Sequence, residues 1–225
     1  MSLSDLPDLA ALDKDGALEE AHAGLTRAGF IVGSAIGGLA LWLPSSASAA
    51  KIPASDQEVL NYALVLEYLQ AAFYTESERA GALKGKAKQA ATTVGAVERA
   101  HVKAFRDLLG KKAVGKPQFD FQGVTEDQKK FLKTAVAFED LAVAAYKGQA
   151  RRLKSKAVLT SALGIHTVEA RHAAWMRYLN GNVPATAAFD RPLTRPAINK
   201  IVASTKFIVQ KKPKTSSRRK PRYTG

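Results

Sequence analysis

The sequence contains no cysteine among its 225 residues. This absence excludes a disulfide scaffold, a zinc ribbon, an iron–sulfur cluster and a thiol nucleophile. Histidine is also scarce, with four residues, so a bound metal ion would depend largely on carboxylates. Glycine and proline are confined to a few places and are missing from long runs rich in alanine, leucine and lysine. This composition favours helices over strands and predicts an all-α fold.

Charge is distributed unevenly along the chain. Residues 1–50 contain two basic and six acidic side chains, a charge of −4, whereas the rest contains 32 basic and 14 acidic side chains, a charge of +18. A surface this basic is typical of proteins that associate with anionic partners such as envelope polymers, lipid headgroups or nucleic acid. The alternative is a solvated, lysine-rich surface that has no such partner.

The N-terminal segment has the parts of an export signal. Residues 28–50 carry no charge, Arg27 precedes them, and Ala47-Ser48-Ala49 fits a cleavage site. We interpret residues 1–50 as a signal peptide or an uncleaved membrane anchor with an acidic leader. Either interpretation predicts a protein exported to the periplasm or cell envelope. A buried helix is a further alternative, and the single arginine of a degenerate twin-arginine motif leaves the export route open.

Four helices are predicted between residues 51 and 180. Capping boxes at Ser55 and Thr125 predict the starts of the first and third helices. The first ends near Arg79, before a glycine-containing turn over residues 80–85. The second ends near Leu109, and residues 110–124 form a longer connection with three glycines and a proline.

The remaining boundaries are weaker in the sequence. The third and fourth helices separate between residues 148 and 156, and the fourth ends at Asn180-Gly181. Residues 181–210 form a C-terminal extension with a short amphipathic helix at about residues 197–209. Residues 211–225 are rich in lysine and arginine without apolar periodicity, which predicts a disordered basic tail.

The candidate metal ligands lie in an internal repeat. Residues 67–74 match residues 139–146, with Glu, Leu, Ala and Tyr at identical offsets. A Glu-x-x-His pair follows each copy, at residues 98–101 and 169–172. The point midway between the lone Glu and its pair falls in a predicted turn in both copies. Each antiparallel hairpin therefore places its lone Glu level with its Glu-x-x-His pair, whose two side chains can reach one ion.

Two such hairpins supply four carboxylates and two imidazoles to a common centre. The pattern resembles the ferritin-like di-iron or di-manganese carboxylate proteins. Within that superfamily the chain is similar to exported ferritin-like domain proteins that include desiccation-related relatives, over roughly residues 51–210. The resemblance implies a ferritin-like four-helix bundle with one long crossover connection, plus a short C-terminal helix.

The resemblance also assigns roles to the six ligands. Terminal carboxylates would come from Glu67 and Glu139, bridging carboxylates from Glu98 and Glu169, and imidazoles from His101 and His172. The implied cofactor is a pair of iron ions or, alternatively, manganese, and zinc also suits the ligands. The competing interpretation is a vestigial polar core without metal, although burying six such groups unpaired would cost several kcal/mol each.

Nearby residues are interpreted more conservatively. Tyr74 and Tyr146 lie two turns after Glu67 and Glu139, and we favour ordinary core aromatics over redox-active residues or hydrogen-bonding partners of the ligands. His166 precedes Glu169 by three residues, and a hydrogen-bonded or surface histidine is favoured over an auxiliary ligand or an iron-entry residue.

Two function classes remain. One is a non-haem di-iron oxidoreductase, a ferroxidase or peroxide-reducing protein that acts on oxygen species in oxidative or desiccation stress of the envelope. The other is a non-catalytic structural or metal-binding envelope protein whose basic tail binds anionic polymers or lipid. A storage cage fits the anchor and tail poorly, and export argues against nucleic acid as a partner. Homo-oligomer formation stays open, and no catalytic residue beyond the ligands is predicted.

Overall fold

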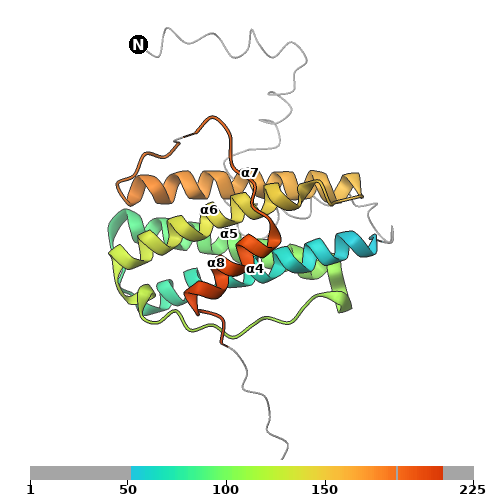
Figure 1. Ribbon diagram of the computed structural model, residues 1–225. Coiled ribbons are helices and arrows are strands. Elements are labelled where there is room, and N and C mark those ends of the chain that lie inside the picture. The colour runs from blue at the N-terminus through green and yellow to red at the C-terminus, as the bar shows by residue number, and fades with distance from the viewer. Residues whose placement is uncertain (1–51, 186, 210–225) are drawn as a thin grey trace, which may run out of the picture.

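The computed structural model describes residues 52–185 and 187–209, and within them the fold is helical (Figure 1). Four long helices form the bundle: α4 (Ala54–Ala80), α5 (Gly85–Leu109), α6 (Gln128–Ala150) and α7 (Lys156–Leu179). A shorter helix, α8 (Arg195–Thr205), lies across the outside of the bundle against α6. The predicted all-α bundle with a short C-terminal helix is confirmed.

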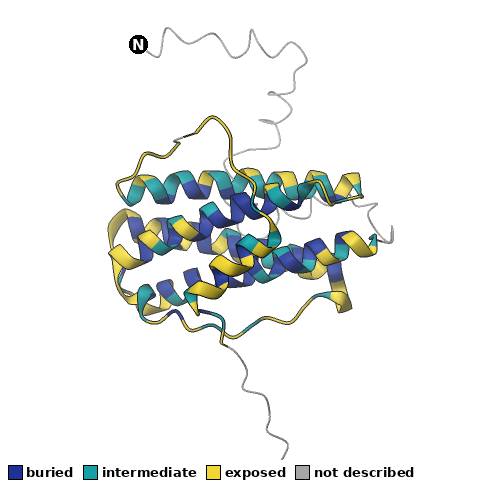
Figure 2. Cartoon of the chain, in the orientation of Figure 1, coloured by how far each residue is buried: buried dark blue, intermediate teal, exposed yellow. Residues whose placement is uncertain are grey.

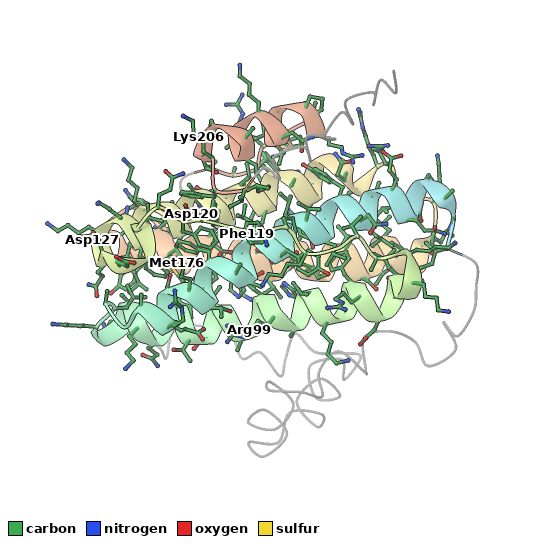
Figure 3. All side chains as sticks on the ribbon, turned by 90° about the horizontal axis from the view of Figure 1, so that it is seen from below. Arg99, Phe119, Asp120, Asp127, Met176 and Lys206 are labelled. Atoms are coloured by element: carbon green, nitrogen blue, oxygen red, sulfur yellow. The ribbon has the colours of Figure 1, made fainter. Side chains whose placement is uncertain are left out.

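The bundle consists of two antiparallel hairpins. Helix α4 packs mainly on α5, and α6 packs mainly on α7. Inward faces are buried and outward faces exposed, as expected for amphipathic helices (Figure 2). In Figure 3, Met176 lies among the helices and is fully buried, whereas Arg99 and Lys206 lie at the surface.

The long connection between α5 and α6 runs along the bundle and pairs with the C-terminal segment. It contains two 3₁₀ turns, η3 (Gly110–Lys112) and η4 (Val124–Glu126). Phe119 and Ile208 form an antiparallel bridge, in which the Asp120 amide donates to Phe207 at 2.9 Å. The connection therefore helps to hold the segment after α8, which the sequence did not indicate.

Both predicted capping boxes are wrong in detail. Helix α4 begins at Ala54 after Pro53, and the Ser55 hydroxyl donates to the Asp56 carboxylate instead of capping. Helix α6 is capped by Asp127, whose carboxylate accepts from the Lys130 amide at 2.8 Å. Thr125 is buried, and its hydroxyl donates to Glu76 on α4. Ser55 is engaged by its neighbour Asp56, whereas Thr125 is engaged by a tertiary contact with Glu76, so neither side chain is left to cap the helix end that the local pattern assigned to it.

The break between the third and fourth helices and the end of the fourth helix agree with the sequence. Helix α6 ends at Ala150, and Ser155 caps α7 through the Val158 amide. Helix α7 ends at Leu179, directly before Asn180-Gly181. The C-terminal helix spans Arg195–Thr205, so the predicted end near residue 209 is wrong: Lys206 adopts a positive φ of 58°, and Ile208 forms the bridge with Phe119.

The predicted export signal or anchor (residues 1–50) and the predicted basic tail (residues 211–225) lie outside the described residues. Among the helices that are described, none combines the length and apolar character needed to cross a bilayer.

Gly148 allows the C-terminal segment to cross α6 closely. The Leu193 amide donates to the Ala144 carbonyl at 3.1 Å, and a Cβ at Gly148 would lie 1.9 Å from the Leu193 carbonyl oxygen. We expect Gly148→Ala to push this segment off α6 and lower the free energy of unfolding by about 2 kcal/mol, measured by urea denaturation. Gly115→Ala is the matched control, because no atom lies within 4 Å of its Cβ position. Equal midpoints for the two variants would contradict the close crossing.

Candidate metal centre

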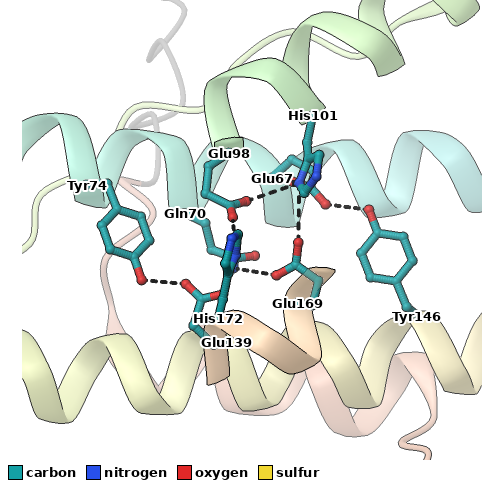
Figure 4. Close-up of polar contacts among 9 residues, drawn as sticks. All are labelled: Glu67, Gln70, Tyr74, Glu98, His101, Glu139, Tyr146, Glu169 and His172. Carbon is teal, nitrogen blue, oxygen red and sulfur yellow. Dashed lines mark hydrogen bonds and ion pairs between the residues drawn. The ribbon is translucent and has the colours of Figure 1, made fainter. Parts of the chain in front are cut away.

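The structure brings the six predicted ligands together in the middle of the bundle (Figure 4). Each helix contributes from its central turns, so no flexible loop positions a ligand. The carboxylates are fully buried, and the two imidazoles are 5% and 7% exposed. The ligands are Glu67 on α4, Glu98 and His101 on α5, Glu139 on α6, and Glu169 and His172 on α7.

Two turns set the register of the hairpins. Gly81, with a φ of 71°, ends α4 in the left-handed conformation that glycine adopts without strain. In the second hairpin the turn is fixed from outside, because the Asp56 carboxylate accepts from the Lys154 and Ser155 amides, both at 2.9 Å. The turns thereby hold each lone Glu level with its Glu-x-x-His pair.

Each imidazole contacts carboxylates from both hairpins. Nδ1 of His101 lies 3.2 Å from Glu67 and 3.2 Å from Glu169. Nδ1 of His172 lies 3.0 Å from Glu98 and 3.5 Å from Glu139. The centre is therefore shared between the hairpins and belongs to neither alone.

The six residues fall into two overlapping groups, each with ligand atoms within 4.8 Å of one another. Glu67 and His101 occur in one group only, and Glu139 and His172 in the other only. Glu98 and Glu169 occur in both groups. This is the arrangement that two ions sharing a pair of bridging carboxylates require.

Burial and the neighbouring charges shift the pKa values of the cluster strongly. Burial raises the pKa of Glu67 to about 7, although His101 opposes the shift. Burial alone would lower the pKa of His172, but Glu139 and Glu98 outweigh it and raise that pKa to about 10. Without metal, the imidazoles therefore carry protons that divalent cations would have to displace.

Several donor atoms of the cluster fit a cation better than a hydrogen bond. Both carboxylate oxygens of Glu98, Oε1 of Glu169 and Nδ1 of His172 have no hydrogen-bond partner among the described residues. These atoms lie close to their neighbours, as the 3.0 Å between His172 and Glu98 shows, yet without hydrogen-bond alignment. Buried polar atoms are almost always paired, so unpaired ligand atoms grouped within 4.8 Å of one another are compatible with an ion site. Four carboxylates also balance the charge of two divalent ions.

Two tyrosines cross between the hairpins to hold the lone carboxylates. The Tyr74 hydroxyl donates to Glu139 at 2.5 Å, and the Tyr146 hydroxyl donates to Glu67 (Figure 4). Burial, followed by the Glu67 charge, keeps the pKa of Tyr146 well above its ordinary value, so the phenol remains a donor. The favoured interpretation of these residues as ordinary core aromatics was incomplete, because they also orient the ligands.

Gln70 also contacts two of the predicted ligands, and this contact was not predicted from the sequence. Its buried amide nitrogen lies 3.2 Å from Glu139 and 3.3 Å from Glu169. It follows Glu67 by three residues and so shares its face of α4, which was the available signal. Its counterpart in the second repeat is Ala142, so the two halves of the centre are chemically different.

We expect Gln70→Ala to weaken divalent-metal binding about 10–100-fold, because Glu139 and Glu169 lose a donor that orients them. Isothermal titration of the metal-free protein with Mn(II) measures the effect. Gln149→Ala is the control, since Gln149 is a buried glutamine that contacts Arg152 away from the ligands. An unchanged affinity in Gln70→Ala would show that the amide does not support the ligands.

His166 lies outside both groups of ligands. Its Nε2 is 4.0 Å from the Asp190 carboxylate, and its side chain is 20% exposed.

Comparison with known proteins agrees with this architecture. The profile of the ferritin-like domain family matches residues 55–182, which span all four helices of the bundle. No curated protein matches the chain. The fold and the buried carboxylate and histidine cluster are compatible with binding of two metal ions. With more than half of its length covered by the family profile, the chain belongs to the ferritin-like domain family.

Proposed function

We propose that the protein binds two iron ions at this centre and uses Fe(II) to reduce dioxygen or peroxide. The observation that carries the proposal is the pair of overlapping ligand groups, which share Glu98 and Glu169 and contain donor atoms without hydrogen-bond partners among the described residues. Imidazole combined with carboxylate suits iron and manganese, and iron is the ion that readily supplies electrons to oxygen species.

Some residues of the site would bind the ions, and others orient the ligands. Glu67, Glu139 and the two imidazoles would each hold one ion, and Glu98 and Glu169 would bridge the pair. Tyr74 and Tyr146 fix the orientation of the lone carboxylates by hydrogen bonds. Bound iron would supply single electrons and open coordination positions for oxygen species. In the balanced reaction, two electrons and two protons convert one dioxygen to hydrogen peroxide, or one hydrogen peroxide to two waters.

The test is iron analysis of the full chain after loading with Fe(II) in air and removal of free metal. We expect about two iron ions per chain, and their loss in Glu98→Ala/Glu169→Ala because the bridging positions disappear. Circular dichroism of the variant checks that it keeps its helices. Consumption of oxygen or peroxide by the loaded protein then measures turnover.

Little iron in either protein would overturn the proposal. The alternative function would then stand: a structural or metal-binding envelope protein that uses its basic surface to hold anionic polymers or lipid. The charge of +18 over residues 51–225 favours such a partner.

We further propose that the protein acts in the cell envelope against oxidative or desiccation stress. The support is the signal-like segment of residues 1–50, with its uncharged run and small residues. Fractionation of cells that carry the full chain tests this, and recovery in the cytoplasm alone would contradict it.

A further inference from the structure

An apolar cavity of about 70 Å³ lies between the four long helices, next to the metal centre. Helices α4, α5, α6 and α7 all contribute to its wall, and almost all of the lining is carbon. The lining includes Leu66, Phe105, Ala145, Tyr146, Ala162 and Ile165.

Tyr146 separates this cavity from the ligands. Its side chain lines the cavity, and its hydroxyl donates to Glu67. Leu66, the neighbour of Glu67 in the sequence, lines the cavity as well. A molecule in the cavity is thus one side chain away from the ligand Glu67.

The two repeats differ at the position that precedes each tyrosine. Phe73 precedes Tyr74 and is fully buried, and its ring centroid lies 5.1–5.5 Å from those of Phe121, Phe131 and Phe138. The residue at the same repeat position before Tyr146 is Ala145, which lines the cavity. Alanine in place of phenylalanine leaves less side-chain volume beside Tyr146 than beside Tyr74.

We propose that this cavity holds dioxygen beside the centre, and that dioxygen rather than hydrogen peroxide is the oxidant that reaches the metal through it. The inference rests on the proposed function. Dioxygen needs no hydrogen bonds, whereas peroxide would lose those it makes with water on entering an apolar space. Size agrees, because an apolar cavity of about 150 Å³ binds benzene or xenon, and about half that volume suits a diatomic molecule better than an acyl chain.

Xenon tests the cavity in the metal-free full-length protein, because it is an apolar atom that enters such spaces. We expect saturable binding by ¹²⁹Xe NMR in the wild type and its loss in Ala145→Phe, which copies the residue of the first repeat. Ala162→Leu fills the same space from the half-buried face of α7, in case Ala145→Phe does not fold. Ala72→Leu is the control, since Ala72 is half-buried and does not line the cavity.

Stopped-flow mixing of the Fe(II)-loaded protein tests the choice of oxidant. We expect the filled variants to react with dioxygen about tenfold more slowly, and with hydrogen peroxide within about twofold of the wild-type rate. The variants should still bind as much iron as the wild type, because no metal ligand is changed.

The outcomes separate this inference from the proposed function. Absence of xenon binding, or a filled variant that slows neither oxidant or both equally, overturns the cavity's role while iron oxidation stands. Absence of bound iron in the wild type overturns the proposed function and, with it, the delivery of dioxygen.

Discussion

Mn(II) added to the metal-free protein is expected to raise its midpoint of thermal unfolding by about 10–20 °C. Four fully buried carboxylates share a small volume in the folded chain, and separate on unfolding. Ions that bind only the folded chain therefore stabilise it, by about 2.7 kcal/mol per site at about 100 times the dissociation constant. For a domain of this size each kcal/mol corresponds to about 2–4 °C. Mn(II) suits the ligand set, and its use measures metal binding apart from the oxidation proposed for Fe(II).

The dependence on concentration distinguishes specific binding from a general salt effect. The midpoint should rise with the logarithm of Mn(II) concentration once the sites are filled. Glu98→Ala/Glu169→Ala is the matched variant, and its midpoint should not change with Mn(II). Equal shifts in both proteins would mean that Mn(II) acts elsewhere on the molecule.

Asp56→Ala is expected to lower the free energy of unfolding by about 3 kcal/mol. The Asp56 carboxylate is fully buried and accepts from the Lys154 and Ser155 amides, nearly 100 residues away. Hydrogen bonds to a charged group contribute about 1.5–3 kcal/mol each, and the amides are left without this acceptor. Chemical denaturation monitored by circular dichroism measures the loss.

Glu58→Ala is the control for this prediction, because it removes an acid from the same turn of α4. Glu58 pairs with Arg195 and Arg152, but its side chain is 55% exposed, so the pairs are screened by water and are worth less than about 1 kcal/mol. Equal losses in the two variants would indicate that the buried carboxylate does not hold the α6–α7 turn.

The bundle and the proximity of the six ligands could be predicted because both follow from periodic, local patterns in the sequence. A Glu-x-x-His pair places two side chains on one helix face whatever surrounds it, and a duplicated hairpin repeats the placement. The turn at Gly81 could be located from the glycines in the local sequence of residues 80–85. Metal ligation by these residues remains a prediction.

Other features depend on contacts between distant parts of the chain. Thr125 has the sequence context of a helix cap, but its hydroxyl donates to Glu76, 49 residues earlier in the chain. The bridge between Phe119 and Ile208 joins segments that no local pattern relates. The crossed tyrosine bonds require the relative placement of the two hairpins, which neither repeat contains by itself. The cavity likewise depends on how the helices pack. Its only signal in the sequence is that Ala145 stands at the repeat position that Phe73 occupies in the first copy.

The crossed bonds have a consequence for how such a molecule could arise. Tyr74 belongs to the first hairpin and serves Glu139 of the second, while Tyr146 belongs to the second and serves Glu67 of the first. One hairpin is therefore half of a centre, and two identical hairpins related by a twofold axis would complete it. Joining two copies in one chain removes the requirement that they stay identical. Gln70 opposite Ala142, and Phe73 opposite Ala145, are differences that a symmetric pair could never hold.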